Sequence, residues 1–497
     1  MKRLNDFIAD IQQTVINPSY NISSPTIYPK PKDKKRLHEL KADEKNVCRP
    51  IALFGLKDRL ILSFTNKFLS KLFDKYFEDC SLAFRAKPMG LVNHHTAIQH
   101  IQEYKAKYKT IPLYVAECDM QKFYDSVNHK TINQQFEMLI SKSKHDAPHL
   151  GLESCERIFL SYLSCYSFNT NILPLNRDDE YWKTYKIAKG KFGWIEKEIE
   201  HYKFYDNITI ERIGVPQGGA LSGLIANIVL DIADKALLAK YKDIFYTRFC
   251  DDMIIMHPNK IICEESITLY KNTLENCQLA PHEFAKDLTE KRQIENKYLS
   301  QISLKPFWKG KSKGPYKWDD IKNEGFPWIG FVGYEIHYNG SVRVRKSSLE
   351  KELKKQKEVI GQIREAISKE QKVSGGTVTE SAIRRLIGMS VSRVELWNYS
   401  TVVHEMCWKN GFQELNPNKY SIKQIKRLDK GRSKLYYQLV KELEGFKIVK
   451  PEKENEDETD ETFKRRQIIL YDKPFSYYYH IIEKAKYAKI DTADQNE

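Results

Sequence analysis

Three aspartates beside apolar segments are the residues in this sequence best suited to bind divalent metal ions. Asp119 follows the apolar run 111–118, and the adjacent Asp251 and Asp252 separate two apolar segments that predict a β-hairpin. Because β-strands disfavour Asp, two aspartates at the tip of an apolar hairpin need an explanation. A polar turn is one explanation, since Asp is common in turns. Asp119 favours a second one, in which the three carboxylates meet in one site.

Such a site is suited to phosphoryl transfer assisted by metal ions. The chain has a formal net charge of +15, so three clustered carboxylates would form a negative site in a positive surface. Mg²⁺ binds a few carboxylate oxygens and completes its shell with phosphate and water. Two ions roughly 3.5–4 Å apart stabilise an attacking 3′-hydroxyl and a leaving pyrophosphate. We therefore expect two Mg²⁺ ions, with Mn²⁺ as a substitute.

A glycine-rich turn is the second feature suited to phosphate chemistry. Residues 214–219, GVPQGG, precede a segment with apolar residues at helical spacing. Glycines let the backbone approach a ligand closely, and a helix N-terminus attracts phosphate. By themselves, these residues fit an ordinary loop before a helix equally well.

Several predicted elements would position these residues. The spacing of apolar residues predicts an amphipathic helix within 49–77, and the apolar run before Asp119 predicts a strand. Asn339 and Gly340 predict a hairpin turn, after which a basic helix is expected. Residues 140–212 are expected to be an inserted element of helices and a hairpin.

Composition excludes several classes of protein. With 41% hydrophobic and 12% aromatic residues among 497, the chain can bury a large core, which excludes wholesale disorder. No apolar run approaches the roughly 18–20 residues of a membrane span, and the first residues do not resemble a secretory signal. The nine cysteines show no CxxC spacing, so reduced thiols are expected. We expect a cytoplasmic protein with no membrane partner and with a polyanionic ligand.

Six segments resemble, in order, the motifs of bacterial reverse transcriptases. KNVCRPIALFGLKDR and SLAFRAKP are similar to the fingers motifs of group II intron-like enzymes. DMQKFYDSVNH, GVPQGGALSGLIANIVL and RFCDDMII resemble the three palm motifs, and WIGFVGYEIHYNG resembles the primer-grip hairpin. The resemblance covers roughly residues 45–345. The palm motifs are similar to those of group II intron and retron enzymes. Among bacterial reverse transcriptases, the resemblance is greatest to the defence-associated, unknown-group enzymes.

This resemblance implies an α+β, right-hand polymerase with fingers, a palm around an antiparallel sheet, a helical thumb and a C-terminal helical extension. The expected boundaries are a basic N-terminal arm at 1–44, fingers at 45–110, palm at 111–335 with an insertion at about 140–212, thumb at 336–410, and the extension at 411–497 with an acidic loop at 451–461.

The resemblance also implies roles for individual residues. Asp119 and Asp251 would contact both metal ions, with Asp252 as the third acid. Tyr124 takes the aromatic position that stacks under the nucleotide sugar and excludes a 2′-hydroxyl. Gln217 would contact the incoming nucleotide and the template.

Basic residues are expected to bind phosphate. Arg49, and Lys45 with it, would contact the triphosphate of the nucleotide, and either Lys286 or Lys291 would lie near the leaving pyrophosphate. A thumb helix would follow a nucleic-acid backbone without reading its sequence, although a solvated charged helix is the alternative. The thumb residues expected to do so include Arg343, Arg345, Lys346 and Lys354.

Two residues of the third palm motif depart from the family pattern. Phe249 stands where Tyr is more usual, and Cys250 stands where Ala, Val or Met is common. An apolar hairpin should accept both.

The implied activity is RNA-directed DNA polymerisation, a nucleotidyl transfer that adds deoxynucleotides to a 3′ end. The expected partners are dNTPs, a DNA product and an RNA template, which we expect to be a noncoding RNA used in antiphage defence; homo-oligomerisation stays open. One alternative is untemplated or repetitive DNA synthesis by the same site; whether a tail tyrosine, such as those at 477–479, primes the product stays open. Another is an inactive palm that serves as an RNA-binding scaffold.

Overall fold

The computed structural model describes most of the N-terminal two thirds of the chain and parts of the remainder. The described residues are 2–32, 46–86, 92–285, 307, 310–368, 378, 381–382, 385–386, 414–416, 418–443, 459–467 and 475–476. The chain divides into two compact units, one of residues 1–97 and 110–326 and the other of residues 98–109 and 327–497. Helices and mainly antiparallel strands together confirm the expected α+β class.

A five-stranded sheet lies at the centre of the first unit. Its order is β5-β6-β3-β8-β7, and every pair is antiparallel except the parallel pair β7–β8. The predicted hairpin and the predicted strand before Asp119 are both confirmed. The strands are β3 (Leu113–Cys118), β5 (Phe245–Phe249), β6 (Asp252–His257), β7 (Phe284–Ala285) and β8 (Ser312–Trp318).

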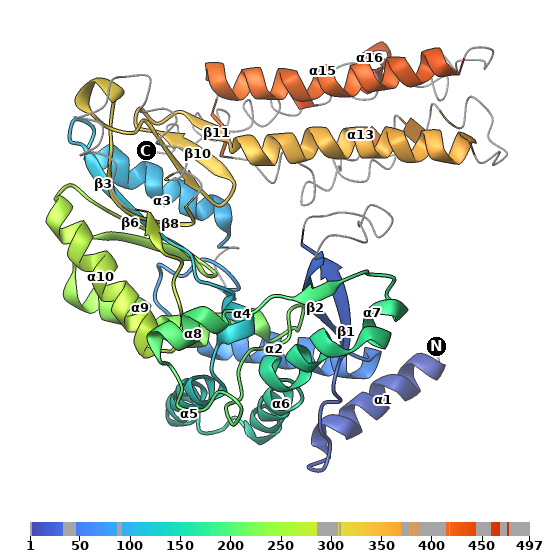
Figure 1. The fold of residues 1–497 in the computed structure, drawn as a ribbon, viewed down its shortest axis with the longest axis vertical. Helices are drawn as coiled ribbons and strands as arrows, with labels where there is room; N and C mark the ends of the chain where they lie inside the picture. The colour runs from blue at the N-terminus through green and yellow to red at the C-terminus, as the bar shows by residue number, and fades with distance from the viewer. Residues whose placement is uncertain are drawn as a thin grey trace. The chain divides into compact units, whose positions relative to one another are not determined.

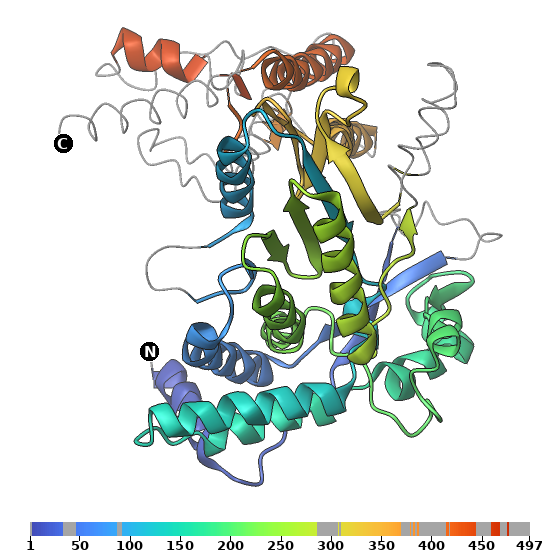
Figure 2. The same ribbon diagram turned by 90° about the vertical axis from the view of Figure 1, so that its left-hand side faces the viewer.

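Two long helices, α9 (Ser222–Lys240) and α10 (Lys260–Asn276), lie side by side against this sheet (Figures 1 and 2). Residues on most sides of α9 are buried, which explains why small and apolar residues dominate it. Helix α10 packs on β3, β6 and β8. The same core continues into helices α2 (Leu56–Phe73), α5 (His129–Asp146) and α6 (Glu153–Ser164).

A second sheet of this unit joins three distant segments. Strand β2 (Asn46–Leu53) pairs antiparallel with β1 (Thr26–Pro31) and parallel with β4 (Gly190–Phe192). β1 belongs to the segment expected to be an N-terminal arm, which begins with α1 (Lys2–Ile16). The hairpin expected within the insertion is wrong for its described residues, because their single strand, β4, pairs with β2 instead. Buried aromatic residues of the insertion, among them Phe168, Trp182 and Phe192, form a core of their own.

Further short elements of the first unit are η2 (Asp74–Tyr76), α4 (Phe123–Ser126), η3 (Phe168–Ile172), η4 (Leu173–Arg177), α7 (Asp179–Thr184), α8 (Glu196–Tyr202) and η5 (Ile321–Asn323). Helix α3 (His94–Lys107) begins in the first unit, and most of its residues belong to the second.

The second unit combines a small sheet with a pair of long helices. Strands β9 (Trp328–Phe331), β10 (Tyr334–His337) and β11 (Val342–Val344) form an antiparallel meander, which confirms the predicted turn at Asn339 and Gly340. Helix α13 (Lys346–Ser368) is the predicted basic helix, and it packs along α15 (Lys419–Glu442). A short helix, α16 (Asp460–Gln467), follows. Among the helices described, none is both long and apolar enough to cross a membrane.

Candidate active site

Strand register brings the three predicted acids to one end of the central sheet. Cys118 of β3 pairs with Met253 of β6, so the next residues, Asp119 and Asp252, lie side by side where the two strands end. Opposed Cα atoms of antiparallel strands lie about 4.5–5.5 Å apart. Asp251 occupies the turn between β5 and β6.

The turn places Asp251 in an electrostatically unfavourable position. Cys250, the residue before it, has a φ of 60°, in the left-handed region that few residues other than Gly adopt. Burial, and after it the negative charge of Asp119, raise the pKa of Asp251 above its ordinary value. A bound cation would relieve this repulsion.

Lys311 supplies a positive charge to Asp119. Its Nζ donates a hydrogen bond to Asp119 Oδ2 at 2.6 Å and lies 3.2 Å from His282 Nε2. Burial, and then the positive charge of Lys311, lower the pKa of His282, so the imidazole is neutral and can accept a hydrogen bond from Lys311. Sequence reasoning missed both residues, because neither belongs to a recognised motif.

The backbone at Asp119 is held from two sides. Ser312 Oγ lies 3.1 Å from the Asp119 amide nitrogen and 3.2 Å from its carbonyl oxygen. The backbone N–H of His282 donates to the same carbonyl at 2.9 Å. These contacts fix the direction in which the Asp119 side chain leaves β3.

The donor chemistry of this end of the sheet fits Mg²⁺ or Mn²⁺ that shares its shell with phosphate. Within the part of the chain that the structure describes, no three His, Cys, Asp or Glu side chains are grouped closely enough to hold a metal ion by themselves. Asp119 and Asp251 nevertheless interact electrostatically from two adjoining segments. A few carboxylates completed by phosphate oxygens and water are the arrangement that Mg²⁺ accepts in proteins.

Tyr124 connects the acidic turn to the glycine-rich turn. Its hydroxyl lies 3.1 Å from the Cys250 thiol, and its carbonyl accepts a hydrogen bond from the Val215 amide at 2.7 Å. Burial, and then the neighbouring Cys250, raise the pKa of the Tyr124 hydroxyl, which therefore stays protonated. The half-buried side chain is thus fixed at its hydroxyl and at its backbone, near Asp251.

Close backbone packing explains the glycines of residues 214–219. Gly214 has a φ of 82°, and a Cβ there would lie 2.8 Å from the Asp125 carbonyl oxygen. A Cβ at Gly219 would overlap the hydroxyl of Tyr162. Larger residues at these two positions would push the turn away from α4 and α6.

Gln217 of this turn is held by a buried acid. Its Nε2 donates to Asp125 Oδ1 at 2.6 Å, and its carbonyl accepts from the Ala52 amide of β2 at 2.9 Å. Lys122 Nζ lies 3.8 Å from the other oxygen of Asp125 and donates to the Gly193 carbonyl of the insertion. Burial lowers the pKa of Lys122 to about 8. The acid at Asp125 was visible in the sequence, whereas nothing in the sequence singled out Lys122.

Of the predicted phosphate-binding residues, the structure describes Arg49 alone. Arg49 is exposed on β2 opposite Lys30. Lys45, Lys286 and Lys291 lie outside the described residues.

The predicted nucleic-acid-binding residues all belong to the second unit. Arg343 stacks on the Trp328 ring, with 3.7 Å from its guanidinium carbon to the ring centre, and its Nε lies 2.6 Å from Glu335 Oε2. The guanidinium of Arg345 lies against the backbone of Gly330. Lys346 and Lys354 are exposed on α13. Arg343 therefore contributes to the packing of its own sheet, and the two lysines are more accessible to a ligand.

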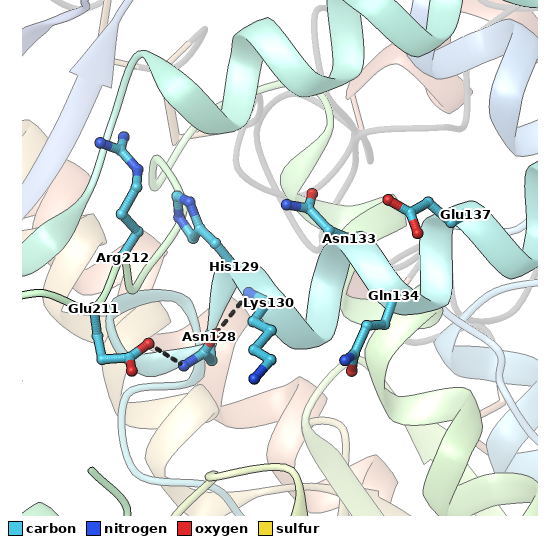
Figure 3. Close-up of a pocket in the computed structure, with 8 residues that line it drawn as sticks. All are labelled: Asn128, His129, Lys130, Asn133, Gln134, Glu137, Glu211 and Arg212. Carbon is cyan, nitrogen blue, oxygen red and sulfur yellow. Dashed lines mark hydrogen bonds between the residues drawn. The ribbon is translucent and has the colours of Figure 1, made fainter. Parts of the chain in front are cut away.

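One pocket of the first unit lies beside the start of α5 (Figure 3). His129, which lines it, is buried, and its Nε2 donates to the carbonyl of Gly214 at 2.7 Å. Burial lowers the pKa of this imidazole to about 4, so it is neutral at pH 7. Through His129, the wall of this pocket therefore contacts the glycine-rich turn at the carbonyl of Gly214. The lining residues are Asn128, His129, Lys130, Asn133, Gln134, Glu137, Glu211 and Arg212.

Comparison with known proteins agrees with the motifs. Residues 170–283 match the family described as reverse transcriptase (RNA-dependent DNA polymerase). This segment contains the glycine-rich turn and the Asp251–Asp252 pair. No curated protein sequence matches the chain.

Solved structures of telomerase are among those similar to the chain. Telomerase from Candida albicans, in complex with a fragment of telomeric RNA, has 11% sequence identity and a TM-score of 0.39 over 88% of this chain and 58% of that one. Apo telomerase from Candida tropicalis has 12% identity and a TM-score of 0.37 over 88% of this chain and 68% of that one. The chain thus matches a little over half the length of the first of these telomerases.

Proposed function

We propose that this chain is an RNA-directed DNA polymerase that adds deoxynucleotides to a 3′ end, and the match of residues 170–283 to the reverse transcriptase family supports the proposal. The observation that carries the proposal is the register of β3 against the β5–β6 hairpin, by which Asp119 and Asp252 lie at adjoining strand ends next to the turn of Asp251 and Cys250, and Cys250 contacts Tyr124. A structural protein would gain nothing from carboxylates that repel one another.

The three aspartates are proposed to hold two divalent cations. When bound, these ions stabilise the negative charge on the attacking 3′-oxygen and on the leaving pyrophosphate. Asp119 directly follows β3 and Asp251 lies in the tight turn between β5 and β6, so strands of the central sheet flank both acids. The raised pKa of Asp251 indicates that this carboxylate gains most from a cation.

Tyr124 and Gln217 are proposed to position the incoming nucleotide. The Tyr124 ring, whose hydroxyl contacts Cys250 and whose backbone is fixed by Val215, would leave no space for a 2′-hydroxyl. Gln217 donates one amide hydrogen to Asp125, and this bond fixes the orientation of the Gln217 amide group. The amide oxygen of Gln217 is thereby held in one direction, in which it could accept a hydrogen bond from a ligand. Arg49 and Lys45 would bind the triphosphate, and Arg343, Arg345, Lys346 and Lys354 the nucleic-acid backbone.

The template, the biological role and the cellular location are also proposals. The similarity of the motifs to defence-associated enzymes supports a noncoding RNA as template and a role in antiphage defence in the bacterial cytoplasm. Sequencing the nucleic acid that copurifies with the protein would identify the template and the product. Equal plating of phage with and without an intact locus would contradict the role in defence.

Primer extension tests the central proposal. The purified chain should extend a DNA primer on an RNA template with dNTPs and Mg²⁺, and it should stop when the cation is chelated. The matched control is Asp243→Asn, an aspartate outside the motifs that should leave extension unchanged. Extension that survives Asp119→Asn would exclude the assigned site, and a wild-type chain that binds RNA without extending any primer would favour the scaffold alternative.

A further inference from the structure

We propose that Lys311 is a resident counter-ion of Asp119 that competes with divalent cations for this carboxylate. The inference rests on the proposed function only in assuming that a divalent cation binds at Asp119. It predicts that the chain binds free cations more weakly than its carboxylates alone would allow.

The ammonium group of Lys311 occupies the position of a ligand on Asp119. Its Nζ lies 2.6 Å from Asp119 Oδ2, although the two residues are 192 positions apart in the sequence. His282 Nε2 lies 3.2 Å from the same nitrogen, which gives the ammonium a second contact. His282 Nε2 is itself 3.9 Å from Asp119 Oδ2, so the three groups form one compact cluster.

The charge of Lys311 acts on both Asp119 and Asp251. Besides pairing with Asp119, it opposes the rise in the pKa of Asp251. A single positive charge that stabilises both carboxylates does electrostatically what a metal ion in the same place would do. Two cations cannot occupy this position on Oδ2 together, so a metal ion that binds Asp119 through this oxygen has to displace Lys311.

The two partners differ in how easily they can move. The Asp119 side chain is only 16% exposed, and its backbone is held by Ser312 and His282. The Lys311 side chain is 60% exposed and ends a flexible chain of four methylene groups. Lys311 can therefore swing into solvent while Asp119 keeps its place, which is what a displaceable counter-ion needs.

Binding of the cation alone tests the inference without any polymerisation. The thermal unfolding midpoint of the full chain would be measured against MnCl₂ and MgCl₂ concentration, without nucleotide or nucleic acid, for wild type, Lys311→Met and Lys311→Arg. Lys311→Met should lower the half-saturating cation concentration about fivefold, the size expected for loss of one exposed competing charge. Lys311→Arg keeps the charge and should resemble wild type.

A matched control removes the same charge elsewhere on the first unit. Lys322→Met changes an exposed lysine of η5, beyond the opposite end of β8, and should leave cation binding unchanged. A shift as large in Lys322→Met as in Lys311→Met would show an effect of net charge alone and would overturn the inference.

Primer extension then separates competition from a direct role in the reaction. Competition predicts that Lys311→Met lowers the Mg²⁺ concentration at half-maximal rate. A slower reaction with an unchanged Mg²⁺ dependence, together with unchanged thermal midpoints, would overturn it. A wild-type chain that binds cations yet extends no primer would reject the proposed polymerase function and leave the thermal test of Lys311 intact.

Discussion

The acidic end of the central sheet and the basic helix α13 use charge in opposite ways. At the sheet, Asp119 is 16% exposed and has defined contacts with Lys311 and Ser312. On α13, the side chains of Lys346 and Lys354 are 79% and 65% exposed, and each approaches a glutamate one turn away at 4.0 and 3.8 Å. Exposed pairs of this kind contribute at most about 1 kcal/mol.

The difference shows where single residues matter. Metal-ion chemistry needs a few charges in fixed positions, and the sheet register provides them. Binding of a nucleic-acid backbone depends on many exposed charges that water and salt can replace. Substitutions at the sheet should therefore change rates sharply, whereas substitutions on α13 should act weakly and additively.

The largest effect is expected from Asp251→Asn. If Asp251 holds a metal ion as proposed, its loss should remove several kcal/mol of transition-state stabilisation, so primer extension should fall on the order of 10³-fold. Steady-state extension rates with saturating Mg²⁺ measure this. A fall of less than about tenfold would contradict the expectation that substitutions at the sheet act more strongly than substitutions on α13.

The same variant should be more stable than wild type without metal. Burial and Asp119 raise the pKa of Asp251 in the folded state, so its stabilising contribution is present at acidic pH and is lost as the pH rises through this raised pKa. Asn avoids that loss, and a gain of about 0.5–2 kcal/mol in the free energy of unfolding at pH 7 is expected. Denaturant titrations with chelator should show the gain shrinking toward acidic pH, and a gain independent of pH would contradict the assignment.

Tyr124→Ala should produce the next largest change, in choice of sugar. Removing the ring frees space beside the nucleotide, and discrimination against ribonucleotides should fall roughly tenfold to a hundredfold. Competition between dNTPs and NTPs measures it. Tyr124→Phe is the control, because it keeps the ring and loses only the contact with Cys250; if it relaxed the sugar preference equally, the hydroxyl rather than the ring would be responsible.

Glycine substitutions compare the two regions by stability. Gly219→Ala would bring a Cβ into the Tyr162 hydroxyl and should cost about 1–3 kcal/mol of unfolding free energy. Gly361→Ala on α13 meets no atom within 4 Å and should stabilise by about 0.5–1 kcal/mol. Denaturant unfolding of both variants checks the pair, and equal effects would show that the glycine-rich turn is no tighter than the helix.

The smallest effect is expected from Lys354→Ala. It should weaken binding to an RNA–DNA duplex only a few-fold and reduce the slope of log affinity against log salt by about 1. Glu358→Ala, which removes the glutamate near Lys354, is the matched control and should not weaken binding. A loss of affinity independent of salt would indicate a packing defect rather than a phosphate contact.

Features with a local pattern could be predicted from the sequence. Apolar runs predicted the β5–β6 hairpin and the strand before Asp119, and the Asn339–Gly340 dipeptide predicted the turn there. Because the acids stand at the ends of these strands, their meeting followed once the strands were assumed to pair. The helix α13 likewise followed from its spacing.

Features that depend on distant contacts could not be predicted. Strand β4 joins β2 through a pairing that no local signal indicates. Lys311 and His282 reach Asp119 only through tertiary packing, and Lys122, which approaches Asp125 and Gly193, itself has the left-handed conformation just before α4. The stacking of Arg343 on Trp328 was equally invisible in a count of basic residues.

The central position of β3 in the sheet affects how the sheet forms during translation. Its neighbours β6 and β8 come much later in the chain, and Lys311 follows Asp119 by 192 residues. At ribosomal rates of about 5–20 residues per second, the nascent β3 must wait about 10–40 s for that segment. Strand β6 is made earlier in this interval, but the other edge of β3 has no partner from the central sheet until β8 has been made. An incomplete chain that stops before β8 lacks one of the two neighbours of β3 and also lacks Lys311, so the surroundings of Asp119 are completed only late in translation.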